Sequence, residues 1–218
     1  MIAQIRRRGL PSYVYRERTL MSKVLAINGS YRDEGMTDQA VEVLAKVLEE
    51  SGAEVEIILL RDYPVEFCLN CRACTQMAGA APGVCVLQDK MQALIDKIER
   101  ADCYILAAPT NFGSVTAVFK RFMERLVCYA CWPWEINGPR YRKARAAKKK
   151  ALLVSSSAAP AILARWFFGT DKQLKMTAKV LGAEVVGSLY TGMIAKQQQP
   201  KLVESVRAKI RLLAGRLV

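Results

Sequence analysis

Apolar residues along the chain form five short continuous runs, separated by stretches in which apolar positions have helical spacing. The first run, at residues 23–27, is rich in valine, leucine and isoleucine without alternation, as expected of a strand buried on both faces of a parallel sheet. Further strands are expected at residues 54–60, 101–108, 151–154 and 184–190. Helices are expected at residues 40–48, 89–100, 115–129, 161–181 and 200–217. This alternation, with crossovers of this length, predicts an α/β domain with a doubly wound parallel sheet.

A polar loop follows the first strand and reads NGSYRDEGMT over residues 28–37. Gly29 and Gly35 let the backbone approach an anion closely. The hydroxyls of Ser30 and Thr37 can donate to that anion, and free N–H groups at the start of the next helix point at it. The glycine spacing excludes both the G-x-x-x-x-G-K-[ST] loop and the G-x-G-x-x-G fingerprint. The loop therefore predicts a site for one phosphate group, although such loops also join strand and helix in ordinary α/β units.

Two segments resemble motifs of the NAD(P)H-dependent FMN reductase family. The loop GSYRDEGMT, residues 29–37, resembles the family's G-S-x-R-x-x-G-x-T phosphate loop. The segment APTNFGSVTAVFKRFMERL, residues 108–126, resembles its P-x-Y-[FW]-G-S-x-x-x-x-x-K-x-x-[IM]-[DE]-R stretch. The chain departs from the family at Asn111, where an aromatic residue is usual, and at Tyr31, where proline is frequent. The resemblance covers most of residues 23–192 and implies a flavodoxin-like fold, with a five-stranded parallel sheet in the order 2-1-3-4-5 and helices on both faces.

The cofactor that the resemblance implies is FMN rather than FAD, because the sequence contains one phosphate loop. Ligands of open parallel sheets lie at the carboxyl ends of the strands, so the loops after the first, third and fourth strands are expected to hold it. Bound FMN would take a hydride from NAD(P)H, which makes the nicotinamide a co-substrate. The residues expected to bind the cofactor are Ser30, Arg32, Gly35, Met36, Thr37, Pro109, Thr110, Asn111, Phe112, Gly113, Ser114 and Ser155.

The composition suits one globular domain and narrows its chemistry. The chain has 218 residues, 52% of them hydrophobic, which favours a single globular domain with a sizeable core. The family resemblance implies that residues 22–218 form a flavodoxin-like FMN-binding domain. Residues 1–21 form a basic arm, expected to be disordered unless it packs on a partner subunit or translation begins at Met21. With 33 basic and 20 acidic residues, the net charge of +13 favours anionic cofactors or acidic partners. The absence of histidine excludes Ser-His-Asp hydrolysis and histidine-ligated zinc, and so favours cofactor chemistry.

Four of the seven cysteines lie in one loop, at residues 62–89. A C-x2-C-x2-C run and a later single cysteine supply them, namely Cys68, Cys71, Cys74 and Cys85. Four thiolates from one loop can bind a tetrahedral metal ion or a cubane iron-sulfur cluster. The run precedes Asp89, Lys90 and Met91 and resembles the cysteine and D-[DK]-M motifs of the iron-sulfur flavoproteins, a branch of the same family, although residues 77–83 lengthen the last gap. The resemblance implies a [4Fe-4S] cluster, and the alternatives are unmetallated thiols or a zinc site.

Other positions are assigned to packing or to solvent. Cys128 and Cys131 lack the usual setting of a redox pair at a helix start, so both are expected to be packing thiols. Lys120 and Arg125 are expected on the solvent or subunit face of their helix. The seven positive charges at residues 140–150 are expected to form a solvated loop, which could also steer NADPH or an acidic redox protein. No base-stacking aromatic residues interleave this run, so nucleic-acid binding is not expected.

These observations together predict an FMN-dependent NAD(P)H oxidoreductase, or iron-sulfur flavoprotein, that passes electrons to a small molecule or a protein acceptor. Aromatic residues at 166–168 interrupt the amphipathic pattern of their helix, so part of this face is expected to meet another subunit. The family resemblance implies a homodimer or homotetramer. The cysteine usage suits a reducing cytoplasm, and no membrane insertion is expected. The alternatives are an electron carrier without nicotinamide activity, and a zinc-binding or cofactor-free interaction protein.

Overall fold

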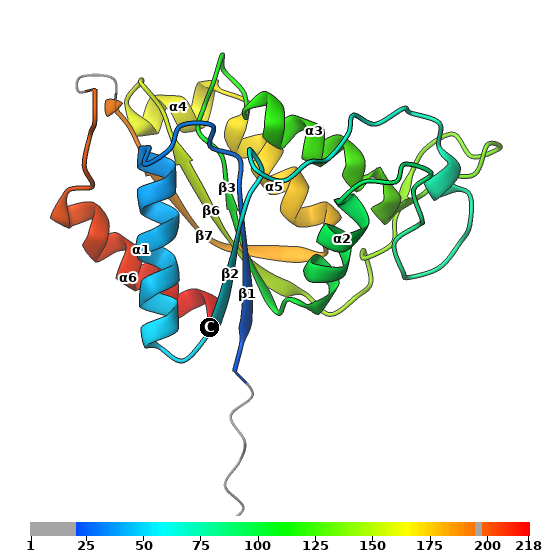
Figure 1. The fold of residues 1–218 in the computed structure, drawn as a ribbon, viewed down its shortest axis with the longest axis horizontal. Coiled ribbons are helices and arrows are strands. Elements are labelled where there is room, and N and C mark those ends of the chain that lie inside the picture. The colour runs from blue at the N-terminus through cyan, green and yellow to red at the C-terminus, as the bar shows by residue number, and fades with distance from the viewer. Residues whose placement is uncertain (1–20, 195–197) are drawn as a thin grey trace, which may run out of the picture.

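The computed structural model describes residues 21–194 and 198–218 (Figure 1). Its main sheet has five strands, all parallel, in the order β2-β1-β3-β6-β7. The strands are β1 (Lys23–Asn28), β2 (Glu54–Leu59), β3 (Cys103–Ala107), β6 (Lys149–Ser156) and β7 (Ala183–Thr191). Numbered along the chain, they have the predicted order 2-1-3-4-5, so the fold prediction is confirmed. The basic arm predicted at residues 1–21 lies outside the described residues, except for Met21.

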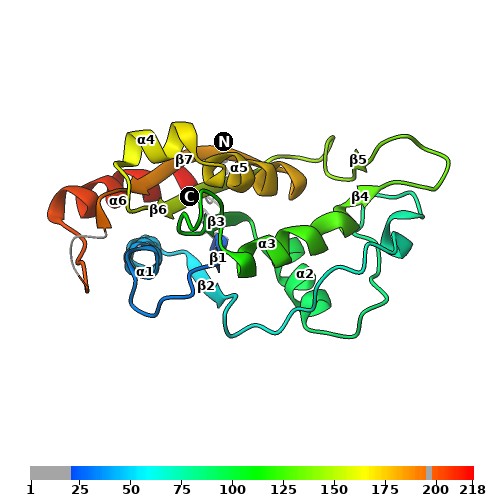
Figure 2. The ribbon, with the colours of Figure 1, turned by 90° about the horizontal axis from the view of Figure 1, so that it is seen from above.

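Helices cover both faces of the sheet (Figure 2). One face carries α1 (Met36–Glu50) and α6 (Glu204–Leu217). The other carries α2 (Met91–Arg100), α3 (Ala117–Arg125) and α5 (Thr170–Val180). Because both faces of the central strands are covered, every residue of β3 is buried, which accounts for an apolar run without alternation.

The region predicted as one helix at residues 161–181 forms two, because α4 (Ala161–Phe167) ends before α5 begins. Phe168 is extended, with φ −101° and ψ 152°. The next N–H, that of Gly169, donates to the carbonyl oxygen of Gly113 at 2.8 Å. This bond joins the break to the loop after β3, so a tertiary contact ends α4 where helical spacing alone predicts continuation.

Part of the basic run at residues 140–150 is structured, which corrects the expectation of a solvated loop. β5 (Arg140–Tyr141) pairs with β4 (Ala130–Cys131) in an antiparallel ribbon, and β6 already begins at Lys149. The guanidinium of Arg142 donates to three carbonyl oxygens, those of Cys128, Gly79 and Cys74, at 3.0, 3.0 and 3.3 Å. The run therefore ties the cysteine-rich loop to the rest of the domain.

Two 3-10 helices complete the region beside the sheet. η1 (Ala73–Thr75) lies within the cysteine-rich loop, and η2 (Leu126–Tyr129) extends α3. The N–H of Trp132 donates to the carbonyl oxygen of Thr75 at 2.8 Å. The loop is thus attached through main-chain bonds to the segment that follows α3.

Candidate functional site

The loops that follow β1, β3 and β6 meet at the carboxyl edge of the sheet (Figure 1). The Gly29 N–H donates to the carbonyl oxygen of Ala107 at 2.8 Å, and the Thr110 N–H donates to that of Ser156 at 2.7 Å. The hydroxyl of Thr116, the N-cap of α3, donates to the carbonyl oxygen of Gly29 at 2.6 Å. The structure thus brings together the three loops that the sequence assigned to the cofactor.

Both hydroxyls of the predicted phosphate loop have partners within the protein. Ser30 and Thr37 are buried. The Ser30 hydroxyl donates to the carbonyl oxygen of Arg32 at 3.1 Å. The hydroxyls of Thr37 and Ser156 share a hydrogen bond of 2.8 Å, which joins the first loop to the third. An anion at this loop would therefore meet main-chain N–H groups first, and the hydroxyls would have to exchange partners to reach it.

The start of α1 is the part of this loop best suited to an anion. Gly35 is the N-cap of α1, and within the described residues no side chain makes a capping hydrogen bond to this helix start. The first N–H bonded to this cap is that of Gln39, which donates to the carbonyl oxygen of Gly35 at 2.9 Å. The N–H groups of the first turn, those of Met36, Thr37 and Asp38, therefore have no acceptor within the helix. Such groups, together with the helix dipole, favour a phosphate.

Arg61 organises the same loop and was not predicted from the sequence. Its guanidinium donates to the carboxylates of Asp38 and Asp33, each at 2.8 Å. It also donates to the carbonyl oxygen of Ser30 at 3.2 Å. Asp38 is buried in the first turn of α1, so Arg61 balances a negative charge beside the free N–H groups. Arg61 lies two residues after the end of β2, and the rule that ligand-binding groups gather at the carboxyl ends of strands could have identified it.

The loop after β3 makes a tight turn that projects from the edge. Asn111 and Ser114 exchange N–H to carbonyl bonds of 2.8 and 3.0 Å. Phe112 and Gly113 between them have φ values of 49° and 75°, as in a type I′ turn. Phe112 is fully exposed. The hydroxyl of Ser114 donates to Oε1 of Gln173 at 2.8 Å, which fixes the base of the turn on α5. The predicted contact between Phe112 and a flavin ring stays a prediction.

Ser155 brings a buried hydroxyl without a partner to the end of β6. Its Oγ finds no hydrogen-bond partner among the described residues. Buried hydroxyls are normally hydrogen bonded, so this atom is unusual. The carbonyl oxygens and ring nitrogens of a flavin accept hydrogen bonds and would satisfy it. The chemistry of the edge, with N–H groups at one end and a free hydroxyl at the other, therefore fits FMN.

The four predicted ligand cysteines line a single cavity, away from this edge. Cys68, Cys71, Cys74 and Cys85 share its walls with Arg72 and Arg125. Burial, followed by the neighbouring cysteines, raises the pKa of the Cys74 thiol to about 11. Within residues 21–194 and 198–218, no group of three or more histidine, cysteine or carboxylate side chains is arranged to hold a metal ion. The donor set of four thiols still fits a soft metal ion or an iron-sulfur cluster, and the identity of the group stays a prediction.

Arg125 is buried beside this cavity, so the prediction that it faces solvent or a subunit was wrong. Its side chain is 1% exposed and pairs with the carboxylate of Asp89, 8% exposed, at 2.5 Å. It also donates to the carbonyl oxygen of Glu66 at 2.8 Å, and its Nη2 lies 3.5 Å from Sγ of Cys85. Pairing with Asp89 compensates the burial of the guanidinium. Lys120 is exposed, as predicted.

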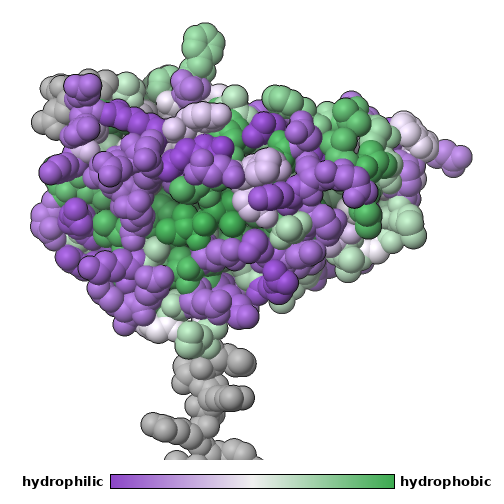
Figure 3. All heavy atoms as spheres, in the orientation of Figure 1, coloured by the Kyte–Doolittle hydropathy of each residue, from purple (hydrophilic) through white to green (hydrophobic). Residues whose placement is uncertain are grey.

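Arg72 holds the same loop from the other side. Its φ of 58° is left-handed, and its guanidinium lies over the rings of Trp132 and Trp134, at 3.9 and 4.4 Å from their centroids. It donates to the carbonyl oxygen of Trp132 at 2.6 Å. The loop exposes several large apolar side chains. They are Phe67, Leu69, Met77, Val84 and Val86. Figure 3 shows apolar surface at the right-hand end of the molecule, where the loop lies in Figure 1.

Helix α3 connects the two candidate sites. Its N-cap, Thr116, binds the loop after β1, and its last residue, Arg125, lines the cysteine cavity. The helix has nine residues, so at about 1.5 Å per residue its ends are roughly 13 Å apart. The sheet edge and the cysteine cavity are therefore separate sites on one rigid element.

Residues 22–193 match the protein family described as NADPH-dependent FMN reductase. The chain belongs to this family. The match spans both loop motifs and the cysteine-rich loop, and it confirms the family resemblance derived from the sequence.

Curated relatives of this FMN reductase family member are named iron-sulfur flavoproteins. One from Archaeoglobus fulgidus is 36% identical over 103 residues, which cover 47% of this chain and 48% of the relative. Another, from Methanocaldococcus jannaschii, is 35% identical over 103 residues, which cover 47% of this chain and 51% of the relative. The chain spans about half the length of the curated relatives it matches. These matches confirm the resemblance to the iron-sulfur flavoprotein branch.

Solved structures share the fold at low sequence identity. An FMN-dependent NADH-azoreductase from Bacillus anthracis, in complex with FMN, has a TM-score of 0.61 and 15% identity, covering 90% of this chain and 99% of that one. An NAD(P)H:quinone oxidoreductase from Methanothermobacter marburgensis has a TM-score of 0.59 and 18% identity, covering 90% and 94%. Likeness at this level concerns the fold alone. Among the described residues, no helix combines the length and apolar character needed to span a membrane.

Proposed function

We propose that the chain is an FMN-dependent NAD(P)H oxidoreductase. The observation that carries the proposal is the family match over residues 22–193, which includes all three loops that meet at the sheet edge. FMN, when bound, supplies a ring that accepts a hydride from a nicotinamide. The residues proposed to hold it are the twelve named from the sequence, from Ser30 to Ser155. The net charge of +13 favours the binding of FMN and of NAD(P)H, both of which are anionic.

The residues of the edge have distinct tasks in this proposal. The N–H groups of Met36, Thr37 and Asp38 bind the phosphate, and Arg61 keeps the Asp38 carboxylate from repelling it. The backbone of the turn from Asn111 to Ser114 borders the ring. The buried Ser155 hydroxyl donates to an acceptor atom of the ring. No side chain has to move a proton, which suits a chain without histidine.

Anaerobic reduction tests this proposal. Purified protein is loaded with FMN, freed of excess flavin, and mixed with NADPH or NADH without oxygen. Oxidation of the nicotinamide with bleaching of the bound flavin supports an oxidoreductase. Tight FMN binding without reduction by either nicotinamide would identify the alternative, an electron carrier. Failure to bind FMN would reject both.

We further propose that Cys68, Cys71, Cys74 and Cys85 hold a [4Fe-4S] cluster. The four thiols share one cavity, and the names of the curated relatives favour a cluster over zinc. A cluster would supply one-electron exchange with an acceptor, a small molecule or a redox protein. The guanidinium groups of Arg72 and Arg125, which line the cavity, would offset part of the negative charge of four thiolates, although Arg125 also pairs with Asp89. None of the seven cysteines, all of which lie within the described residues, forms a disulfide, which fits the reducing cytoplasm that we propose as the location.

Replacing Cys71 with serine should abolish the cluster and leave FMN bound. Anaerobically purified wild-type protein should contain about four iron atoms and about four acid-labile sulfides per chain, and the C71S variant almost none. The matched control is Cys131→Ser, because Cys131 does not line the cavity. Stoichiometric zinc in the wild-type protein would contradict the cluster, as would the absence of both iron and sulfide.

We also propose that the chain forms a homodimer or homotetramer through α4 and the turn after β3. Both segments expose large apolar side chains, which supports a contact with another subunit. The side chains are Phe112, Ile162, Leu163, Trp166 and Phe167.

Replacing Trp166 with glutamate should convert the assembly to a monomer, because a carboxylate would be desolvated in the interface. Sedimentation velocity measures the change, and Leu212→Glu, on the exposed face of α6, serves as the control. A wild-type protein that sediments as a monomer at micromolar concentration would contradict the proposal.

A further inference from the structure

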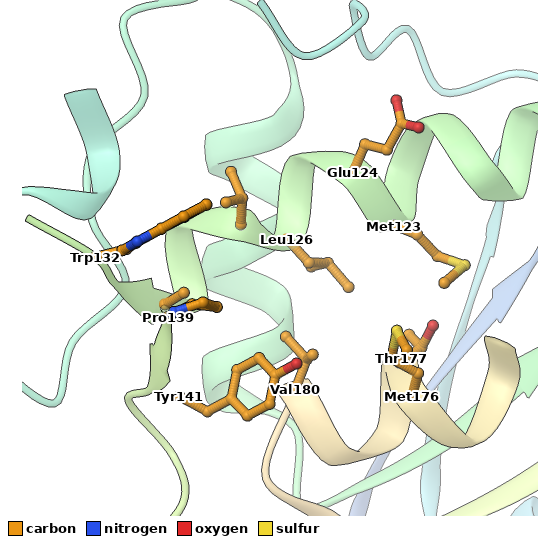
Figure 4. Close-up of a pocket in the computed structure, with 11 residues that line it drawn as sticks. Met123, Glu124, Leu126, Trp132, Pro139, Tyr141, Met176, Thr177 and Val180 are labelled. Carbon is orange, nitrogen blue, oxygen red and sulfur yellow. The ribbon is translucent and has the colours of Figure 1, made fainter. Parts of the chain in front are cut away.

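A cavity of about 260 Å³ lies between α3, α5 and the ribbon of β4 and β5 (Figure 4). None of the residues proposed to hold FMN or the cluster lines it. Its walls are mainly carbon and sulfur. The aliphatic part consists of Leu126, Val127, Ala130, Pro139 and Val180. Its volume is close to the lower end, about 300 Å³, of pockets that hold small molecules.

Aromatic rings and thioethers face one another across this cavity. Figure 4 shows Trp132 and Tyr141 on one side and Met123 and Met176 on the other. Flat rings pack well against aromatic faces, and flexible thioethers adapt to the rings they contact. The shape and the lining therefore suit a planar ring compound.

The polar atoms of the lining are engaged elsewhere. The carboxylate of Glu124 pairs with Lys120 at 3.1 Å. The hydroxyl of Thr177 donates to a carbonyl oxygen of its own helix at 2.9 Å, and the indole N–H of Trp132 donates to that of Ile136 at 2.7 Å. Tyr141 brings one hydroxyl that can bind a carbonyl or hydroxyl of a ligand. No cationic side chain is among the lining residues, although the ammonium of Lys179 lies 5.9 Å from the centroid of the Tyr141 ring. An anion in the cavity would therefore lose most of its hydration with little compensation.

The cavity adjoins the cysteines. Val127 lines both this cavity and the one that contains Cys68, Cys71, Cys74 and Cys85. The Trp132 ring, part of the wall, carries the guanidinium of Arg72 on its face at 3.9 Å. A bound molecule would thus be separated from the cysteine cavity by a single layer of side chains.

We propose that this cavity is a second ligand site, for a neutral planar compound of one or two fused rings. The site is independent of the sheet edge, so binding does not require FMN. A role for the bound compound as electron acceptor would rest on the proposed function, whereas the binding itself does not.

Methionine methyl signals test the site directly. The full chain is labelled with ¹³C at its methionine methyl groups, and 2-naphthol, neutral at pH 7, is added to FMN-free protein. The signals of Met123 and Met176, assigned through Met→Leu variants, should shift together and saturate, because a bound ring shields them. The signal of Met91, which lies outside the cavity and away from the sheet edge, should stay in place.

A charged ligand and a filled cavity provide the controls. Naphthalene-2-sulfonate has the same rings with a negative charge and should bind at least about tenfold more weakly. Val180→Trp should abolish the shifts by filling the cavity, whereas Val203→Trp, at an exposed position, should not. If V180W fails to fold, the affinities of the wild-type protein for 2-naphthol and for naphthalene-2-sulfonate still test the proposal. No saturable shift of the two signals, or equal affinity for both compounds, would overturn the proposal while leaving the flavin assignment untouched.

Discussion

Replacing Gly35 with aspartate should weaken FMN binding by at least about 100-fold and change riboflavin binding by less than about threefold. Gly35 caps α1 with φ −67°, a value that other residues adopt. The new carboxylate would lie at the free N–H groups of the first turn, where the phosphate is proposed to bind. Two like charges at one helix terminus repel each other, whereas riboflavin carries no phosphate. Quenching of flavin fluorescence during titration measures both affinities.

Gly35→Ser is the matched control for the charge. A serine hydroxyl can cap the helix without repelling an anion, so G35S should lose less than about tenfold in FMN affinity. A Cβ at this position would lie 3.1 Å from the carbonyl oxygen of Arg32, a strain that both variants share. Equal losses of FMN and riboflavin in G35D would indicate a damaged fold. Unchanged FMN affinity would mean that the phosphate binds elsewhere.

Replacing Arg125 with methionine should lower the free energy of unfolding by about 3–5 kcal/mol. The change leaves the Asp89 carboxylate buried, 8% exposed, without its guanidinium partner at 2.5 Å. Because the methionine side chain is similar in length to that of arginine, the cavity that it leaves should cost less stability than the loss of the ion pair. Urea unfolding at neutral pH measures the difference. The double variant R125M/D89N should recover part of the loss, because it removes the unpaired charge.

The stability that R125M loses should depend on pH, in a direction set by the pKa of Asp89. Burial alone would raise the pKa of Asp89, but hydrogen bonds from Arg125 and from the N–H groups of Glu66 and Met91 lower it below its ordinary value of 3.8. A lowered pKa contributes stability above the ordinary value, which is lost as the pH falls through the lower, folded value. Without Arg125, burial dominates and the carboxyl takes up a proton more readily. The difference in free energy of unfolding between the wild type and R125M should therefore decrease as the pH falls from 7 towards about 4. A difference that stays constant over this range would contradict the role of Arg125 in stabilising the Asp89 carboxylate.

The sheet could be predicted from the sequence because its strands are buried on both faces. β1 and β3 appear as continuous apolar runs, and the crossovers between strands leave few arrangements. The division of residues 161–181 could not be predicted, since it depends on a hydrogen bond between Gly169 and Gly113. Helical spacing reports which face of a helix is apolar, and it contains no information about a partner 56 residues earlier in the chain.

Only some residues of the two candidate sites could be predicted from the sequence. The loops and the four cysteines could be named because their residue types are locally unusual. Arg125 was misplaced because an arginine in an amphipathic helix is normally exposed, and its partner Asp89 lies 36 residues away. Arg61 was missed for a related reason, since its partner Asp38 belongs to another element. Buried ion pairs of this kind follow from tertiary contacts, which no short sequence window contains.

A crystal structure of the chain grown with FMN tests the central claim most directly. The account predicts one FMN per chain at the carboxyl edge of the sheet, with its phosphate at the N–H groups of Met36 and Thr37. Its ring should lie between the turn at Asn111 to Ser114 and the hydroxyl of Ser155. An empty edge in crystals saturated with FMN, or FMN bound only in the cavity between α3 and α5, would contradict it.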